Sequence, residues 1–263
     1  MSIAHRIGSA LIACAALSSA WAQSTPAVPT PDHVVLVVME NHAYPDIIET
    51  AKAPFITQLA GHGANFTNAF AVTHPSQPNY FALFSGSTHG VTDNNRHTVD
   101  APTVSGALRS IDKSFIGYVE SGSPRKHNPW ESFADAGDVE RNFTAFPSDF
   151  GTLPSIGFVI PNLAHDMHDG SIEEGDAWLK QHLDAYAGWC SATNNMLLVT
   201  FDEDDGKAGN RIATVFFGGP VKPGRYGERI DHYRVLRTLE AMHGLPPLGD
   251  SAEVLPITDI WRP

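Results

Sequence analysis

Acidic side chains gather directly after two apolar stretches of the chain. Residues 33–39 (HVVLVVM) are followed by a Glu-Asn pair, and residues 195–201 (NMLLVTF) are followed by four consecutive acids. Adjacent carboxylates repel one another unless a cation or solvent relieves the charge, and such oxygen ligands suit hard or borderline divalent ions. A solvated loop is the simpler expectation for Asp204 and Asp205. The predicted ion ligands are Glu40, Asn41, Asp202 and Glu203.

Residues 73–80 (THPSQPNY) place a hydroxyl where a helix is predicted to begin. Ser76 is a candidate N-cap, because serine is among the residues favoured at that position. The backbone N–H groups and the dipole at such a helix end also favour an anion, and a metal or base can activate the hydroxyl as a nucleophile. The side-chain amide of Asn79 has two donors for a phosphoryl oxygen, although solvent or a turn can use them instead.

Histidine is frequent, with 13 residues against 17 Lys and Arg, and several histidines lie in loops. Residues 161–170 (PNLAHDMHDG) pack two His and two Asp into five positions. This density predicts metal ligation or phosphate binding, with His168 and Asp166 as the leading residues. Asp231 and His232 open the last predicted helix, where the aspartate either caps the helix or joins the imidazole in a metal or acid–base site.

Alternating strand and helix patterns position these groups. Apolar runs rich in β-branched residues are typical of strands buried on both faces, and hence of central parallel strands. The predicted strands are residues 33–39, 114–120, 195–201 and 211–217, with a short strand at 69–72 and an apolar run at 156–160. The predicted helices are residues 53–61, 77–85, 173–187 and 231–243, and the middle of the chain, 86–130, is predicted to be rich in loops. Such alternation favours a mostly parallel sheet covered by helices, with ligands beyond the carboxyl ends of the strands.

Residues 1–22 are typical of a signal peptide. A basic start precedes an apolar run that is too short to span a bilayer, and the segment closes on an A-x-A cleavage pattern at Ala22. A lipoprotein cleavage box that ends at Cys14 is the second choice. The protein is therefore predicted to be exported, either to the periplasm or out of the cell.

The remaining chain has the composition of a globular protein, with 42% hydrophobic and 17% charged residues. Residues 23–32 are predicted to be a flexible lead-in, and residues 33–263 a single domain. After cleavage Cys190 would be the one remaining cysteine, so no internal disulfide can form. The formal charge of −12 disfavours nucleic acids as partners, although a metal or local donors can still attract a small anion into a pocket.

Six segments, taken in order, resemble the bacterial phosphoesterase family that contains secreted acid phosphatases and phosphatidylcholine-type phospholipases C, in the alkaline-phosphatase-like superfamily. The matching segments are residues 35–44, 73–80, 126–130, 161–170, 199–206 and 230–240. The resemblance implies a three-layer α/β/α sandwich with a mostly parallel central sheet. In size the chain is similar to the small secreted acid phosphatases and lacks the C-terminal domains of the larger phospholipases, which favours a phosphomonoesterase over a diesterase.

The resemblance also carries roles over to individual residues. Ser76 matches the nucleophile position, Glu40 and Asn41 match the first metal-binding pair, and Asp202 and Glu203 match the late acidic pair. That pair is often Asp-Asp in the acid phosphatases, and the Asp-Glu form resembles the phospholipase branch. Further polar positions in the matched motifs are His74, Lys126, His127, Asp166, His168 and His232. Of these, Asp166 is assigned to the metal, while His74, Lys126 and His232 are assigned to substrate binding together with Asn79.

The mechanism that the resemblance implies is a two-step phosphoryl transfer. A divalent ion, whose identity the sequence does not give, would lower the pKa of the Ser76 hydroxyl so that its oxygen attacks phosphorus. His168 or His127 would protonate the leaving oxygen, which is worth roughly 10²–10⁴-fold in rate. Water would then hydrolyse the phosphoserine. Without a metal, histidines and Lys126 would supply the electrostatic stabilisation instead.

Three alternatives follow from the same residues. The first keeps the fold and changes the substrate to phosphodiesters, phospholipid head groups or phosphoinositides. The second is an exported metal- or solute-binding protein, which the setting of Ser76 disfavours, and the third is a sulfatase, whose nucleophile motif is missing. We expect small phosphate esters as partners, and no stable membrane insertion, because the chain has no basic amphipathic helix. The oligomeric state does not follow from the sequence.

Overall fold

One β-sheet runs through the centre of residues 28–263, the part of the chain that the computed structural model describes. The predicted signal peptide, Cys14 and the lead-in up to residue 27 lie outside the described residues. The strands are β1 (Val34–Met39), β2 (Ala64–Phe70), β3 (Phe115–Val119), β4 (Glu140–Asn142), β5 (Ile156–Ile160), β6 (Met196–Phe201), β7 (Arg211–Gly218), β8 (Gly224–Tyr226) and β9 (Ile230–Asp231). Their order in the sheet is β4-β3-β5-β1-β6-β7-β2-β8, and β9 also pairs with β2.

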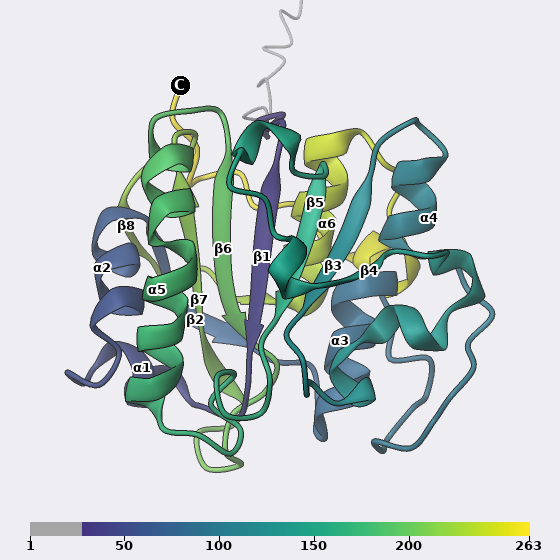
Figure 1. The fold of residues 1–263 in the computed structure, drawn as a ribbon, viewed down its shortest axis with the longest axis horizontal. Coiled ribbons are helices and arrows are strands. Elements are labelled where there is room, and N and C mark those ends of the chain that lie inside the picture. The colour runs from purple at the N-terminus through teal and green to yellow at the C-terminus, as the bar shows by residue number, and fades with distance from the viewer. Residues whose placement is uncertain (1–27) are drawn as a thin grey trace, which may run out of the picture.

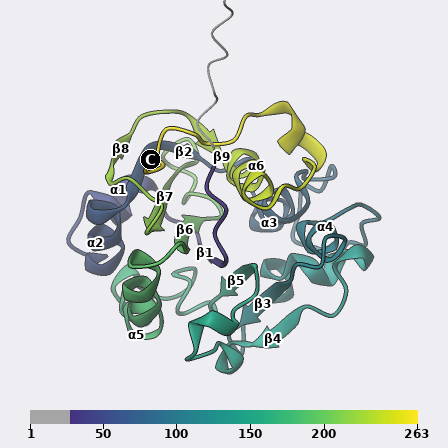
Figure 2. The same cartoon turned by 90° about the horizontal axis from the view of Figure 1, so that it is seen from above.

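Helices cover both faces of this sheet, as Figures 1 and 2 show. The helices are α1 (Tyr44–Ile48), α2 (Pro54–His62), α3 (Ser76–Ser85), α4 (Val104–Arg109), α5 (Ile172–Ser191) and α6 (His232–His243). One layer consists of α1, α2 and α5, and the other of α3, α4 and α6. The predicted α/β/α sandwich is thus confirmed. Among the described helices, none has the length and hydrophobicity that crossing a membrane requires.

The predicted parallel character of the sheet is also confirmed, with one exception at β7. This strand runs antiparallel to both of its neighbours, β6 and β2. The sequence pattern placed β2 at 69–72, whereas the strand begins at Ala64, because its polar residues mask the apolar positions. The short elements α1, α4, β4, β8 and β9 were not predicted. Six 3₁₀ turns complete the fold: Arg125–His127, Pro129–Ser132, Ala134–Ala136, Phe143–Ala145, Phe150–Thr152 and Gly249–Glu253.

The register of the two central strands brings the acidic segments together. β1 and β6 are buried at every position and pair in parallel, with Met39 opposite Phe201. Glu40 and Asp202 therefore leave the sheet side by side at its carboxyl edge. The C-terminus lies at the opposite edge, near the start of β1 (Figure 1). Parallel pairing of two apolar strands is thus what creates the acidic cluster.

Helix α3 forms the core on one side of the sheet and is buried along its whole length. Its Phe84 ring lies 5.3 Å from the ring of Phe115 and 5.8 Å from that of Phe133, measured between centroids. A helix that is enclosed on all sides cannot tilt or slide without opening cavities. The residues at its N-terminal end, including Ser76, are therefore held rigidly beside the carboxyl edge of the sheet.

A buried glutamate holds the C-terminal segment against α6. Glu240 accepts hydrogen bonds from the Leu248 backbone N–H at 2.9 Å and from the Ser251 hydroxyl at 3.0 and 2.9 Å. Burial raises the pKa of Glu240 from 4.5 to about 7, although these hydrogen bonds oppose the shift. The folded protein therefore binds a proton at Glu240 more tightly than the unfolded chain does.

We predict that Glu240 makes stability fall as the pH rises. Because the folded pKa lies above the unfolded pKa, the free energy of unfolding should decrease between pH 4.5 and about 7, by about 2 kcal/mol from this group. The free energy of unfolding, measured by chemical denaturation across this range, should depend less on pH in Glu240→Gln than in the wild type. The exposed Glu253 supplies the control, Glu253→Gln, which should follow the wild-type profile. Parallel profiles for wild type and Glu240→Gln would contradict this account.

Candidate active site

Ser76 begins helix α3 and lies between two carboxylates. Its Oγ is 3.2 Å from Glu40 Oε2 and 3.1 Å from Glu203 Oε1. The N-cap of the helix is Pro75, so the interpretation of Ser76 as the N-cap is wrong and the hydroxyl is not used for capping. A hydroxyl has one proton and can donate to only one of the two carboxylates. A cation or a further proton is needed to relieve the other contact.

Asn79 holds the turn that presents this hydroxyl. Its Oδ1 accepts the backbone N–H groups of Val72 and Thr73, both at 3.0 Å. Its Nδ2 donates to the carbonyl oxygens of Thr73 at 2.9 Å and Pro75 at 3.3 Å. The side chain is fully buried. The predicted contact of Asn79 with substrate is therefore wrong, because its amide is used entirely within the turn.

Glu40 is enclosed at the end of β1 and contacts Ser76 with only one of its oxygens. The other, Oε1, accepts the Tyr80 hydroxyl at 2.5 Å and lies 3.0 Å from His127 Nε2. Burial favours the neutral acid, but His127 and the Tyr80 hydrogen bond together lower the pKa of Glu40. Burial likewise opposes a charge on His127, and the carboxylates of Glu40 and Asp166 outweigh it and raise the histidine pKa. The lowered pKa of Glu40 and the raised pKa of His127 both favour the charged forms, so the two side chains form a buried ion pair.

His127 lies behind Glu40 and not at the surface. The ring is fully buried, and its Nδ1 lies 3.2 Å from Asp166 Oδ2. Both ring nitrogens thus face carboxylates, on opposite sides of the ring. The prediction that His127 protonates a leaving group is therefore wrong, since a substrate cannot reach it.

Asp202 is fully buried and lies beside Glu40 at the end of the neighbouring strand. Its Oδ1 accepts the backbone N–H groups of Asn41 at 3.1 Å and Glu203 at 2.6 Å. Burial and the nearby charges of Glu40 and Glu203 raise the pKa of Asp202 well above 3.8. Its backbone carbonyl lies 2.7 Å from Nε2 of the buried His232. His232 thus supports the acidic turn from inside, and its predicted contact with substrate is wrong.

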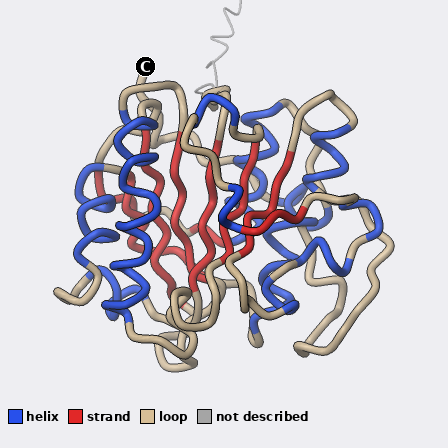
Figure 3. Tube along the Cα trace, viewed as in Figure 1, coloured by secondary structure: helices blue, strands red, loops and turns tan. Residues whose placement is uncertain are grey.

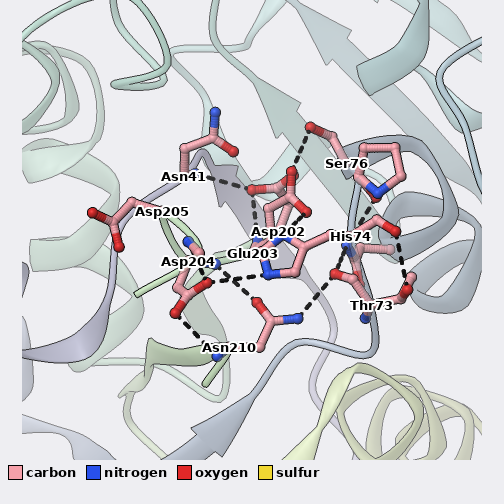
Figure 4. A network of polar contacts seen from close by, with 12 residues as sticks. Asn41, Thr73, His74, Ser76, Asp202, Glu203, Asp204, Asp205 and Asn210 are labelled. Carbon is pink, nitrogen blue, oxygen red and sulfur yellow. Dashed lines mark hydrogen bonds and ion pairs between the residues drawn. The ribbon is translucent and has the colours of Figure 1, made fainter. Parts of the chain in front are cut away.

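His74 lies between Asp204 and Glu203, the second carboxylate beside Ser76 (Figure 4). His74 Nδ1 lies 2.5 Å from Glu203 Oε2, and its Nε2 lies 3.2 Å from Asp204 Oδ1. Asp204 is buried and accepts three backbone N–H groups from the turn that follows it. The prediction of a solvated loop is therefore wrong for Asp204, whereas Asp205 is exposed as expected. A substrate would have to displace a carboxylate to reach either nitrogen of His74.

Two basic side chains lie on the solvent side of Ser76. Lys126 Nζ is 3.5 Å from Ser76 Oγ and 3.3 Å from His168 Nε2. His168 Nδ1 in turn lies 2.6 Å from Asp169 Oδ1, and the histidine side chain is 28% exposed. Lys126 and His168 are thus the sequence-predicted residues that combine access to solvent with proximity to the hydroxyl.

The acidic cluster meets two requirements of a metal site. Glu40, His127 and Asp166 offer donor atoms that lie within 4.8 Å of one another, and all three residues are buried. Asp202 Oδ2 is buried and has no hydrogen-bond partner among the described residues, which is costly unless an ion or proton satisfies it. Asp166 Oδ2, Glu203 Oε2 and both ring nitrogens of His127 also lack hydrogen-bond geometry, but each lies within 3.2 Å of an ion-pair partner. The donor set, rich in oxygen, fits a divalent cation.

Two residues that support the site were not predicted. Tyr80 lies one helical turn after Ser76, so the helical period alone was sufficient to place both on one face. Glu120 follows β3 and accepts the Asn162 backbone N–H at 2.9 Å, while His165 Nδ1 lies 2.8 Å from its Oε1. It thereby anchors the loop that carries Asp166 and His168. Nothing in the local sequence distinguishes Glu120 from an ordinary surface acid.

Comparison with known proteins agrees with this geometry. The model of the Phosphoesterase family matches residues 47–246, which is most of the chain. The chain belongs to the Phosphoesterase family. It is 45% identical to a phosphatidylinositol-3-phosphatase of Mycobacterium tuberculosis, over 95% of this chain and 92% of that protein. It is 31% identical to an acid phosphatase of Aspergillus fumigatus, over 81% of this chain but only 55% of that longer protein.

These relatives bear out the predicted family and the prediction of a phosphoric monoester hydrolase. Among solved structures, this Phosphoesterase-family chain is similar to a protein in the alkaline phosphatase superfamily from Vibrio parahaemolyticus, with a TM-score of 0.62. The two are 12% identical, and the match covers 88% of this chain and 72% of the other. At this identity the likeness establishes the fold, which is the one expected from the sequence motifs.

We predict that Asn79 supports the turn and does not bind substrate. Asn79→Ala leaves buried backbone groups without partners, so the free energy of unfolding should fall by about 2–4 kcal/mol. Thermal or urea denaturation measures the change. Asn68→Ala is the control, because Asn68 makes one long hydrogen bond of 3.4 Å at the surface. Unchanged stability together with a raised KM for p-nitrophenyl phosphate would instead indicate a contact with substrate.

Proposed function

We propose that the protein is an exported phosphatase that hydrolyses phosphate monoesters through a phosphoserine at Ser76. The observation that supports this most directly is the position of its hydroxyl, which is 2% exposed and lies between Glu40 and Glu203, with Lys126 3.5 Å away. A structural serine needs neither two carboxylates nor a cation. Export is inferred from the pattern of residues 1–22 alone.

A divalent cation is the counter-charge that best fits this cluster. Glu40 and Asp202 would hold it beside Ser76, with Asn41 as an amide ligand and with Asp166 behind Glu40, while Glu203 would remain free to accept a proton. When bound, such an ion supplies positive charge that favours the ionised hydroxyl and offsets charge on the phosphoryl oxygens. The carboxylates support the assignment, because burial and mutual repulsion raise the pKa of Asp202, while burial raises that of Glu203.

The side chains of the protein account for each proton in the first step. Ser76 Oγ forms a bond to phosphorus and releases its proton to Glu203 Oε1, at 3.1 Å. Glu203 is a better acceptor than Glu40, because burial raises its pKa, whereas His127 and Tyr80 lower that of Glu40. As the bond between phosphorus and the leaving oxygen breaks, His168 donates a proton to that oxygen.

In the second step water attacks the phosphoserine. His168, now without the proton it donated, accepts one from the water, and the released Ser76 oxygen regains a proton from Glu203. Inorganic phosphate leaves, and each side chain returns to its starting state. The ammonium group of Lys126 stabilises the negative phosphoryl group throughout.

The substrate class favoured by the comparisons is a phosphate monoester, with phosphoinositides as a specific candidate. The relative that is similar over nearly its whole length is named a phosphatidylinositol-3-phosphatase. Diesterase activity is the second candidate, because the Asp202-Glu203 pair resembles the phospholipase branch. The small head-group phosphate of a phosphoinositide needs access only to Ser76, Lys126 and His168.

We predict that Ser76→Ala lowers kcat for p-nitrophenyl phosphate by at least about 10³-fold, because the nucleophile is lost. Steady-state assays measure the rate, and denaturation shows whether the fold is retained. Acid quenching of the wild type during turnover, followed by mass spectrometry, should find phosphate on the peptide that contains Ser76. Assays with phosphatidylinositol 3-phosphate and bis-p-nitrophenyl phosphate compare the monoester and diester candidates. Wild-type rates in Ser76→Ala would refute the mechanism.

We predict that removal of divalent cations lowers the rate by about 10²-fold or more, because the buried carboxylates then retain protons or repel the phosphate. Exhaustive dialysis against a chelator, followed by addition of single metal ions, measures the loss and its recovery. The control is enzyme dialysed in the same way against buffer that contains no chelator. Full activity without metal would assign the electrostatic role to Lys126 and His168.

A further inference from the structure

Tyr80 is placed to control the orientation of Glu40. It is 1% exposed, and its hydroxyl donates to Glu40 Oε1 at 2.5 Å. Ser76 lies one turn earlier on the same helix and contacts the other oxygen, Oε2, at 3.2 Å. One helix face therefore contacts both oxygens of a single carboxylate. This arrangement leaves the Glu40 side chain no freedom to rotate about its terminal bond without breaking a contact.

The two oxygens of Glu40 face different surroundings. Oε1 faces the interior, where Tyr80 and His127 lie, and Oε2 faces Ser76 and the carboxylate of Glu203. Donors on the interior side hold Oε1, so Oε2 stays available for a cation beside the nucleophile. Outer groups of this kind orient a ligand, and their loss typically weakens metal binding about 10–100-fold.

His127 cannot provide this orientation by itself. Its ring stacks on the Tyr80 ring, with centroids 5.1 Å apart and planes 12° apart, so its own position depends on the tyrosine. Its contacts to Glu40 and Asp166 lie on opposite sides of one imidazole, and neither has hydrogen-bond geometry. The hydrogen bond from Tyr80 is the directional contact on Oε1.

We propose that Tyr80 is a positioning residue: its hydroxyl holds Glu40 so that Oε2 faces Ser76 and binds the divalent cation there. The inference rests on the proposed function, in which a cation assists the serine. It adds that the affinity for the cation depends on a phenol that touches neither substrate nor nucleophile. Tyr80→Phe removes this hydroxyl and leaves the stacking on His127 in place.

Calorimetric titration of metal-free protein with Mn²⁺, Mg²⁺, Ca²⁺ and Zn²⁺, each alone, tests the proposal. For the ion that the wild type binds most tightly, the Kd should be about 10–100-fold weaker in Tyr80→Phe. At saturating concentration of that ion, kcat for p-nitrophenyl phosphate should recover most of the wild-type value. A residue that acted only through general stability would leave the metal Kd of the folded protein unchanged.

Tyr186→Phe is the matched control, because Tyr186 is equally buried and donates one hydrogen bond, to the Met196 carbonyl at 2.9 Å, far from the acidic cluster. It should lose similar stability and keep the wild-type Kd for the metal. If Tyr80→Phe unfolds under these conditions, the titration is repeated in sucrose, which favours the folded state.

Three results would overturn the proposal: an unchanged metal Kd in Tyr80→Phe, an equal loss of affinity in Tyr186→Phe, or a wild type that binds none of the four ions. The proposed function fails separately, if the wild-type protein does not hydrolyse phosphate monoesters or if Ser76→Ala remains active. An active wild type with metal affinity insensitive to Tyr80→Phe would thus refute the positioning role alone.

Discussion

Repulsion among buried carboxylates is the constraint on which this structure depends. Four buried acids form one cluster in the interior, where charge is poorly screened: Glu40, Asp166, Asp202 and Glu203. No arrangement of backbone donors alone can neutralise so many acids. The fold contacts each carboxylate with side chains or backbone N–H groups, and His127 is shared between Glu40 and Asp166. The proposed cation would relieve the remaining charge.

The partners come from segments that lie far apart in the sequence. Tyr80 approaches Glu40 from the buried helix α3, and His127 approaches it from the 3₁₀ turn after β3. His74 lies between Glu203 and Asp204, while the first turn of α6 supplies His232 behind Asp202. The supporting groups lie on the protein side of the acids, and the basic groups Lys126 and His168 lie on the solvent side. This division places the Ser76 hydroxyl between the acids and the two basic side chains.

Much of the fold could be predicted from the sequence, because the apolar runs of β1, β5 and β6 and the amphipathic pattern of α5 are strong local signals. The acidic ends of β1 and β6 also pointed to the site, since parallel strands end at a common edge. The predictions for Asn79, His127 and His232 were wrong for a shared reason. Their residue types suit binding and catalysis, but their depth of burial depends on packing between distant segments.

The same limit applied to the supporting residues. Asp204 looks like one more acid in an exposed run, and only the tertiary contact with His74 explains its burial. Tyr80 was within reach of a periodicity argument, because its spacing from Ser76 is one helical turn. Glu120 had no comparable signal, since its partners lie more than 40 residues further along the chain.

The contacts of Ser76 depend on complete folding of the chain. The serine touches one carboxylate 36 residues before it and another 127 residues after it. Neither contact exists until β1, α3 and β6 have assembled, so a nascent or unfolded chain carries an ordinary, unreactive serine. Under the proposed function, hydrolysis therefore requires the complete fold, and an unfolded chain would leave phosphate esters intact.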